Sequence, residues 1–226
     1  MSALLFNLKN ADLAYDDLMV LREVNFKIEA KEKIVLVGPS GAGKTTLLNK
    51  LYQLRPHECS FIQQHFTLIK QLSVIANIHL KRLDYFPIFF HLINFIEARR
   101  RKFNRMLPIL KIIGMQEKMS AKVGYLSNEQ QQRVAVGRAL YQDQPILLAD
   151  EPVAAMAFSQ ADIMLSALFN RENTIIMALH SVELTLKYAQ RIVGLNAGRI
   201  RFDLPRRKVT PDHITDLYLN DNSSET

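Results

Sequence analysis

The chain has 226 residues, of which 48% are hydrophobic and 23% are charged, as in an ordinary folded globular domain. Its most apolar stretch, residues 86–96, is shorter than the roughly 20 apolar residues that span a bilayer, and its start lacks the pattern of a signal peptide. We therefore expect neither an integral membrane protein nor a secreted one, and the single Cys59 fits a reducing cytoplasm.

The net charge is +7, and a basic run lies at residues 99–102. Such a run can bind nucleic acid or anionic lipid, but runs of this kind are usually solvated helix faces. We expect no nucleic-acid partner.

Strand and helix patterns alternate along the chain. Two alternating apolar segments, residues 4–8 and 24–28, predict antiparallel strands. Buried-strand patterns follow at residues 34–37, 146–149 and 174–179, and the first of them precedes a helical pattern at 45–54. This order predicts an α/β fold with a mainly parallel central sheet.

The segment from about residue 73 to residue 120 has a different pattern, with helical periodicity throughout and Gly114 as a stop. We expect a helical lobe inserted into the α/β core. One domain over residues 1–226 would then consist of a core (about 1–72 and 142–204), a helical subdomain (about 73–141) and a tail (about 205–226) with a short helix at 212–219.

The strongest motif is a glycine-rich turn between the strand at 34–37 and the helix at 45–54. It matches G-x-x-x-x-G-K-[ST] in full: Gly38, Pro39, Ser40, Gly41, Ala42, Gly43, Lys44 and Thr45, followed by Thr46. Backbone N–H groups of such a turn cradle phosphates, the lysine reaches the β- and γ-phosphates, and the hydroxyl of Thr45 contacts Mg²⁺. A chance glycine turn is the alternative, and the flanking strand and helix argue against it.

An acidic pair, Asp150 and Glu151, ends the buried strand at residues 146–149. Beside a phosphate-binding loop, Asp150 would hold Mg²⁺ and Glu151 would act as general base on the attacking water. The alternative is a solvated loop. The chain has no N-K-x-D motif, which argues against a GTPase.

The order of these motifs resembles the ABC ATPase family over nearly the whole chain. The segment from Leu126 to Leu140 is similar to the signature helix of the family, which usually begins L-S-G-G-Q. The resemblance implies a switch role for His180, a contact of Gln64 with Mg²⁺, and stacking of adenine on Tyr15. It also implies ATP and Mg²⁺ as cofactors.

Residues 66–78 and 178–200 look like those of ATPase subunits of phosphonate and related oxyanion importers. In the family, two cassettes pack head to tail, so that Ser127 and Gln130 would face the nucleotide of a partner cassette. The S-x-x-Q spacing of these two residues predicts a capping box that opens a helix. Transmembrane permease subunits would be the other partners, which places the chain peripherally on the inner face of the cell membrane.

Several positions depart from the family pattern. Asn128 and Glu129 replace the two signature glycines, Ala157 replaces an aspartate, and Lys31 replaces a turn glycine. Only 20 positions (64 − 44) separate Lys44 from Gln64, which indicates a trimmed β subdomain. Glycine allows a close backbone approach to phosphate, whereas Glu129 adds a negative charge beside a polyanion.

Three function classes follow. The leading one is ATP hydrolysis that powers an importer of phosphonate-like oxyanions. The altered signature and Ala157 leave open a regulatory or structural cassette that binds ATP and hydrolyses little. A soluble ABC protein acting on DNA or ribosomes is disfavoured, because the chain has neither a second cassette nor a long coiled-coil insert.

Overall fold

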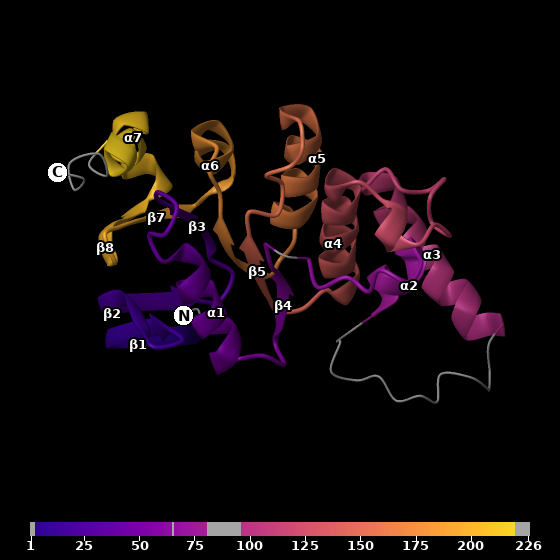
Figure 1. The fold of residues 1–226 in the computed structure, drawn as a ribbon, viewed down its shortest axis with the longest axis horizontal. Helices are drawn as coiled ribbons and strands as arrows, with labels where there is room; N and C mark the ends of the chain where they lie inside the picture. Colours follow the sequence, from indigo (N-terminus) through magenta and orange to yellow (C-terminus); the bar gives the residue numbers. More distant parts are fainter. Residues whose placement is uncertain (1–2, 65, 81–95, 220–226) are drawn as a thin grey trace. The chain divides into compact units, whose positions relative to one another are not determined.

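The computed structural model describes residues 3–64, 66–80 and 96–219, and the chain forms two compact units (Figure 1). The first unit joins residues 1–64, 144–154 and 169–226, and the second joins residues 65–143 and 155–168. The finer boundaries that we expected for core, helical subdomain and tail stay a prediction.

A six-stranded sheet forms the centre of the first unit, with its strands in the order β4-β5-β6-β3-β7-β8. Neighbouring strands are parallel except β7 and β8, which are antiparallel. The bounds are Lys33–Val37 (β3), Cys59–Ile62 (β4), Ile146–Asp150 (β5), Thr174–Ala178 (β6), Arg191–Asn196 (β7) and Arg199–Pro205 (β8). Strands β3, β5 and β6 are buried along their whole length, as in parallel sheets that are covered on both faces. The predicted mainly parallel sheet is confirmed.

The antiparallel hairpin at the amino terminus is also confirmed, and it is longer than the sequence pattern indicated. Strands β1 (Leu4–Tyr15) and β2 (Leu18–Glu29) pair along their length. Helix α1 (Lys44–Leu54) packs against this hairpin and against β5 and β6. The shared core includes Phe6, Phe26, Leu36, Leu47, Leu51 and Leu148.

Lys31 closes the connection between β2 and β3 with φ of 71°, in the left-handed region that glycine adopts most easily. The expectation that this turn favours glycine is therefore confirmed by its geometry. The Nζ atom of Lys31 lies 2.6 Å from a carboxylate oxygen of Glu172, in an exposed ion pair.

Helices α6 (Val182–Tyr188) and α7 (Pro211–Leu219) lie on the opposite side of the sheet from α1 and the hairpin (Figure 1). A short 3₁₀ turn, η2 (Arg206–Lys208), leads from β8 to α7. Helix α7 packs against β7, and Asn196 at the end of β7 donates from Nδ2 to the carbonyl of Leu217 at 2.7 Å. The predicted helix at 212–219 is thus confirmed.

Helices dominate the described part of the second unit. Both α2 and α3 pack against α4. The bounds are Val74–His79 (α2), Ile96–Ile112 (α3), Val123–Tyr125 (the 3₁₀ turn η1), Asn128–Gln142 (α4) and Phe158–Phe169 (α5, whose last residue belongs to the first unit).

The expected helical periodicity throughout residues 73–120 is wrong for the stretch after α3. Gly114, at φ of 63°, ends that helix as predicted, and the chain continues in turns. The carbonyls of Met119 and Ala121 accept hydrogen bonds from the backbone of Ile75 and Val74, so the first turn of α2 takes acceptors that a continuing helix would need. Residues 81–95, with nearly all of the apolar stretch 86–96, lie outside the described residues.

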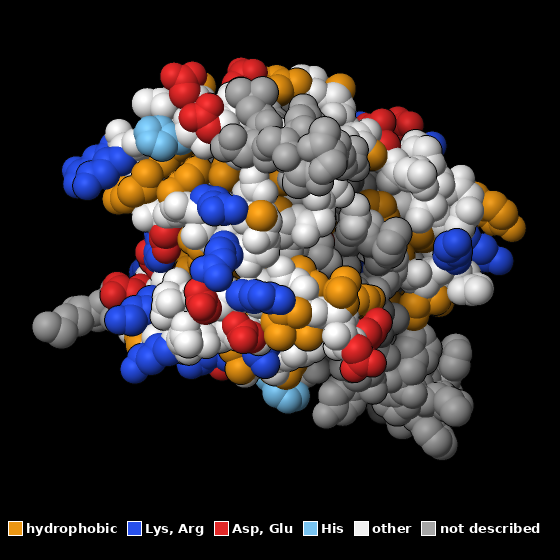
Figure 2. Space-filling model, turned by 60° about the vertical axis from the view of Figure 1, so that its left-hand side comes forward, with side chains coloured by type: hydrophobic (Ala, Val, Ile, Leu, Met, Phe, Trp, Pro, Cys, Tyr) orange, Lys and Arg blue, Asp and Glu red, His pale blue; other side chains and the backbone are white. Residues whose placement is uncertain are grey.

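Charge is mixed on the face drawn in Figure 2, where acidic and basic side chains alternate with apolar ones. Among the residues that the structure describes, no helix has both the length and the hydropathy that crossing a bilayer requires.

Candidate nucleotide-binding site

The candidate site lies at the carboxyl edge of the central sheet. The strand register pairs Leu36 with Ala178 and Ala178 with Asp150, and Ile62 pairs with Ala149. The loops that leave β3, β4, β5 and β6 therefore start side by side, as is usual for ligand sites of open α/β sheets. They carry the glycine-rich turn, Gln64, the acidic pair and His180, respectively.

Two glycines of the turn are required by the packing around them. Gly38 has φ of 149°, and a Cβ atom there would lie 2.0 Å from the carbonyl oxygen of Leu195 on β7. Gly43, the N-cap of α1, has φ of 98°, and a Cβ atom there would lie 2.6 Å from Cγ of Leu21. Both the backbone conformation and the neighbouring atoms disfavour a larger residue, most strongly at Gly38, where the neighbour is backbone.

Lys44 begins α1, and its side chain folds back onto the turn. Its ammonium donates to the carbonyl oxygens of Gly38 at 2.7 Å and of Pro39 at 2.8 Å. Burial lowers the pKa of Lys44, while the carboxylates of Glu151 and Asp150 act in the opposite direction. The cation thus sits at the centre of the turn, close to two acidic groups.

Thr45 and Asp150 bring a hydroxyl and a carboxyl group together. The Oγ1 atom of Thr45 donates to Oδ2 of Asp150 at 2.6 Å, and Asp150 is only 2% exposed. Burial raises the pKa of Asp150, and the hydrogen bond from Thr45 partly offsets that rise. Mg²⁺ prefers oxygen ligands of this kind, so these residues fit a magnesium ion.

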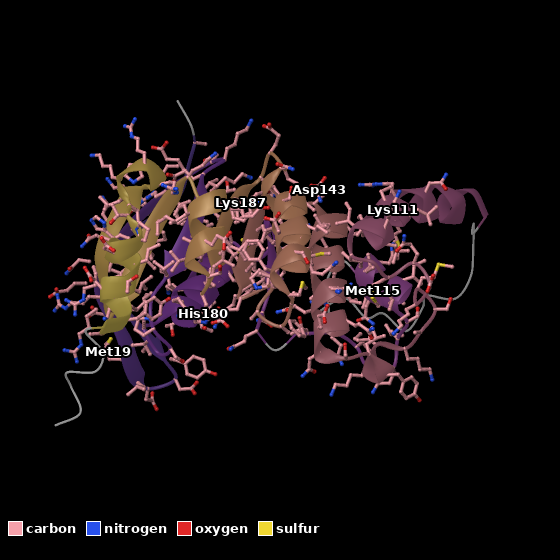
Figure 3. The ribbon with its side chains drawn as sticks, turned by 90° about the horizontal axis from the view of Figure 1, so that it is seen from above. Met19, Lys111, Met115, Asp143, His180 and Lys187 are labelled. Carbon is pink, nitrogen blue, oxygen red and sulfur yellow. The ribbon has the colours of Figure 1, made fainter. Side chains whose placement is uncertain are left out.

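Glu151 and His180 form the second pair at this edge. His180 lies on the loop between β6 and α6 (Figure 3), and its Nε2 atom is 2.5 Å from Oε1 of Glu151. Glu151 has φ of 51°, and its backbone N–H donates to the carbonyl of Ala178. A non-glycine residue in the left-handed region is uncommon and is a feature of many active sites.

Tyr15 and Gln64 make no side-chain hydrogen bond or ion pair with the residues that the structure describes. Tyr15 ends β1, and its side chain is exposed beside those of Leu18 and Met19 on the hairpin. Gln64 lies two residues beyond β4, with its side chain exposed. Both side chains are therefore free to meet a ligand.

The predicted capping box at the start of α4, in the second unit, is confirmed. Ser127 is the N-cap, and its Oγ atom accepts from the backbone N–H of Gln130, whose side chain accepts from the N–H of Ser127. Glu129 forms an ion pair with Arg133 one turn later. A cavity of about 220 Å³ opens here, lined by Gly114, Met115, Glu117, Lys118, Ser127, Glu129, Gln130 and Arg133.

Ala157 stands directly before α5, at its N-cap position. Its carbonyl accepts from the N–H groups of Gln160 and Ala161. The methyl side chain of alanine cannot cap the free N–H groups of the first turn, as an aspartate at this position can.

Residues that support the turn were not found by reading the sequence. Leu21 and Leu195 pack against Gly43 and Gly38, but they come from β2 and β7. They carry no motif: Leu21 faces Gly43 with its side chain and Leu195 faces Gly38 with its backbone carbonyl, and nothing in the sequence indicates which residues of other strands will lie beside a glycine.

The sheet order, the glycine-rich turn between β3 and α1, and the acidic pair at the end of β5 define a P-loop NTPase. The family model described as ABC transporter matches residues 21–154. The chain belongs to the family of ABC transporter ATP-binding subunits.

Relatives and solved structures agree with this assignment. The phosphonates import ATP-binding protein PhnC of Lactobacillus delbrueckii subsp. bulgaricus is 33% identical, over 96% of this chain and 95% of the relative. PhnC 1 of Pseudomonas syringae pv. syringae is 35% identical, over 92% and 89%. A dimeric ATP-binding cassette in a post-hydrolysis state with ADP and Pi is 26% identical, with a TM-score of 0.74, over 90% of this chain and 99% of that one.

Proposed function

We propose that this chain binds Mg-ATP at the carboxyl edge of the sheet and hydrolyses it. The observation that carries the proposal is the meeting of two pairs, Thr45 with Asp150 and Glu151 with His180, beside Lys44. A P-loop ATPase needs these groups together, because one pair serves the metal ion and the other serves the attacking water.

Binding would use the turn and the hairpin. The N–H groups of residues 40–46 would surround the phosphates, with Lys44 turned from the Gly38 and Pro39 carbonyls toward the β- and γ-phosphates. Tyr15 would stack on the adenine. Thr45, Asp150 and Gln64 would hold Mg²⁺, which neutralises charge on the phosphates when it is bound.

Glu151 would then accept a proton from the water that attacks the γ-phosphorus, while the bond from that phosphorus to the bridging oxygen breaks and releases ADP and phosphate. His180 would orient the Glu151 carboxylate through the hydrogen bond at Nε2. Because the side chain of Glu151 is 17% exposed, the carboxylate remains within reach of water.

We further propose that two such cassettes form a dimer in which Ser127 and Gln130 face the nucleotide of the partner cassette. The dimeric cassette that is similar to this chain supports the formation of a dimer. Permease subunits would anchor the dimer on the inner face of the membrane. The relatives named for phosphonate import support a phosphonate-like oxyanion as the transported substrate.

Steady-state ATPase activity of the purified chain at millimolar Mg-ATP tests hydrolysis. Glu151→Gln should abolish turnover while ATP binding is retained, because the amide cannot accept the proton. Glu172→Gln is the matched control, since Glu172 is an exposed glutamate that forms a surface ion pair with Lys31. Equal rates for the wild type and Glu151→Gln would refute the assignment.

Substrate class is tested with the chain assembled with permease and binding-protein partners. ATPase stimulation by methylphosphonate, and not by an amino acid of similar size, is expected. Stimulation by the amino acid alone would contradict oxyanion import and leave the hydrolysis proposal intact.

A further inference from the structure

Glu129 lies in the first turn of α4, two residues after the N-cap Ser127. The N–H groups of a first turn have no acceptor within the helix, and together with the helix dipole they attract anions. The carboxylate of a glutamate is itself such an anion. Because side chains on a helix lean toward its N-terminus, an unpaired Glu129 would compete with a phosphate for this helix end.

The carboxylate of Glu129 is paired within the same helix. Its Oε1 atom accepts from Nη2 of Arg133, and the spacing of four residues places both side chains on one face of α4. The side chain of Arg133 is 19% exposed and that of Glu129 is 38% exposed, so water screens the pair only in part. The ion pair therefore offsets the charge of Glu129 and occupies an oxygen that could otherwise accept from the helix end.

The surroundings of Arg133 hold its guanidinium beside this carboxylate. A Cβ atom at Gly114 would lie 3.2 Å from Nη1 of Arg133, so the glycine that follows α3 leaves room for the guanidinium. The Nε atom of Arg133 is buried and has no hydrogen-bond partner among the residues that the structure describes, so the ion pair with Glu129 orients the group. Both residues line the same cavity as Ser127 and Gln130. The pair is thus part of the surface at the start of α4.

We propose that Arg133 is a positioning residue of the signature helix, which offsets the charge of Glu129 and keeps its carboxylate off the helix end. This end can then face the phosphates of a nucleotide that a second copy of the chain binds. The inference rests on the proposed dimer and deepens it. A signature helix without its two glycines stays compatible with a polyanion, because the charge that replaces one of them is paired four residues later.

ATP-driven dimerisation tests this role without turnover. The parent protein is Glu151→Gln, which should bind ATP without hydrolysing it, and sedimentation at saturating Mg-ATP gives its dimer dissociation constant. At each nucleotide site, Arg133→Gln should cost about fivefold for the lost positive charge and about twofold for the released carboxylate. With two sites in a dimer, the constant should rise roughly a hundredfold.

Two further variants serve as controls. Arg133→Lys should restore most of the affinity, because the ammonium keeps the charge. Lys111→Gln removes an exposed cation in the last turn of α3 and should leave the constant unchanged. The Kd of the monomer for Mg-ATP should be the same in all variants, because the pair would face only the nucleotide of the partner.

A double-mutant cycle with Glu129→Gln separates pairing from packing. Glu129→Gln alone should tighten the dimer about fivefold per site, and in that background Arg133→Gln releases no carboxylate and should cost only about fivefold per site. The double variant should therefore dimerise about as well as the parent protein. If Arg133 only packs against Gly114, the double variant should be as impaired as Arg133→Gln alone.

A dimer that forms with ATP but is unaffected by Arg133→Gln would overturn the inference alone. The same follows if the double variant is no better than Arg133→Gln. A parent protein that binds Mg-ATP and stays monomeric would refute the proposed dimer, and the inference with it. Sedimentation of the parent protein with Mg-ATP distinguishes these failures before any variant is compared.

Discussion

Two glycines of the turn, the exposed Gly41 and the buried Gly43, should differ in how much stability an alanine substitution costs. Both have positive φ, 78° at Gly41 and 98° at Gly43, so alanine at either position adopts a left-handed backbone at a cost of about 1–2 kcal/mol. A Cβ atom at Gly41 meets nothing within 4 Å, whereas at Gly43 it lies 2.6 and 2.7 Å from Cγ and Cδ2 of Leu21. Overpacking of this kind costs a further 1–3 kcal/mol or so.

Urea unfolding of the nucleotide-free protein measures the difference. Gly41→Ala should lower the free energy of unfolding by about 1–2 kcal/mol and Gly43→Ala by about 2–5 kcal/mol. Leu21→Ala costs about 2–5 kcal/mol alone because Leu21 is fully buried, but in combination with Gly43→Ala it removes the collision. The double variant should thus lose less free energy of unfolding than the sum of the losses in the two single variants. Strictly additive losses, or equal losses for Gly41→Ala and Gly43→Ala, would refute the reasoning.

Three further outcomes follow from named contacts. Burial lowers the pKa of Lys33 from 10.5 to about 8. Between these two pH values the unfolded chain binds more protons than the folded chain, so the free energy of unfolding should rise with pH across that window. Lys33→Met should remove this rise when unfolding is measured as a function of pH. Ala157→Asp should cap α5 and raise the free energy of unfolding by about 1 kcal/mol in urea titration, whereas Ala154→Asp, outside the helix, should not. Glu129→Gln should raise the ATPase rate about fivefold, because it removes a negative charge whose repulsion of a partner's phosphates costs about 1 kcal/mol. Glu117 lines the same cavity, and Glu117→Gln should have a smaller effect on the rate.

Features set by short-range sequence patterns were predictable. Strand β3, the turn and α1 follow from one continuous segment, in which apolar residues, glycines and a helical pattern stand in order. The capping box at Ser127 is local as well, since both of its hydrogen bonds join residues three positions apart. The left-handed turn at Lys31 could be expected from the family pattern alone.

Features that depend on distant residues were missed. Strand β7 and the short strand β4 were not predicted, although β7 lies beside β3 and supports the turn. The helical prediction for residues 73–120 failed after Gly114, where the chain turns back and the first turn of α2 takes the carbonyl of Met119 as a hydrogen-bond acceptor. The hydrogen bond from Lys44 to the Gly38 carbonyl depends on the side-chain rotamer of Lys44. The contact between Leu195 and Gly38 depends on the order of the strands in the sheet. No sequence motif predicts either contact.

The position of Cys59 in strand β4 determines how reactive the chain's single thiol is. Cys59, the first residue of β4, is the chain's single cysteine, and it is buried, with desolvation raising its pKa to about 12. Thiolate is the reactive form, so this thiol resists alkylation and oxidation at neutral pH. A cysteine introduced on the surface, for example at exposed Asn128, would then be the one site that maleimide reagents label. A spectroscopic probe at this site could report the closure of two cassettes, and the native cysteine would not have to be removed first.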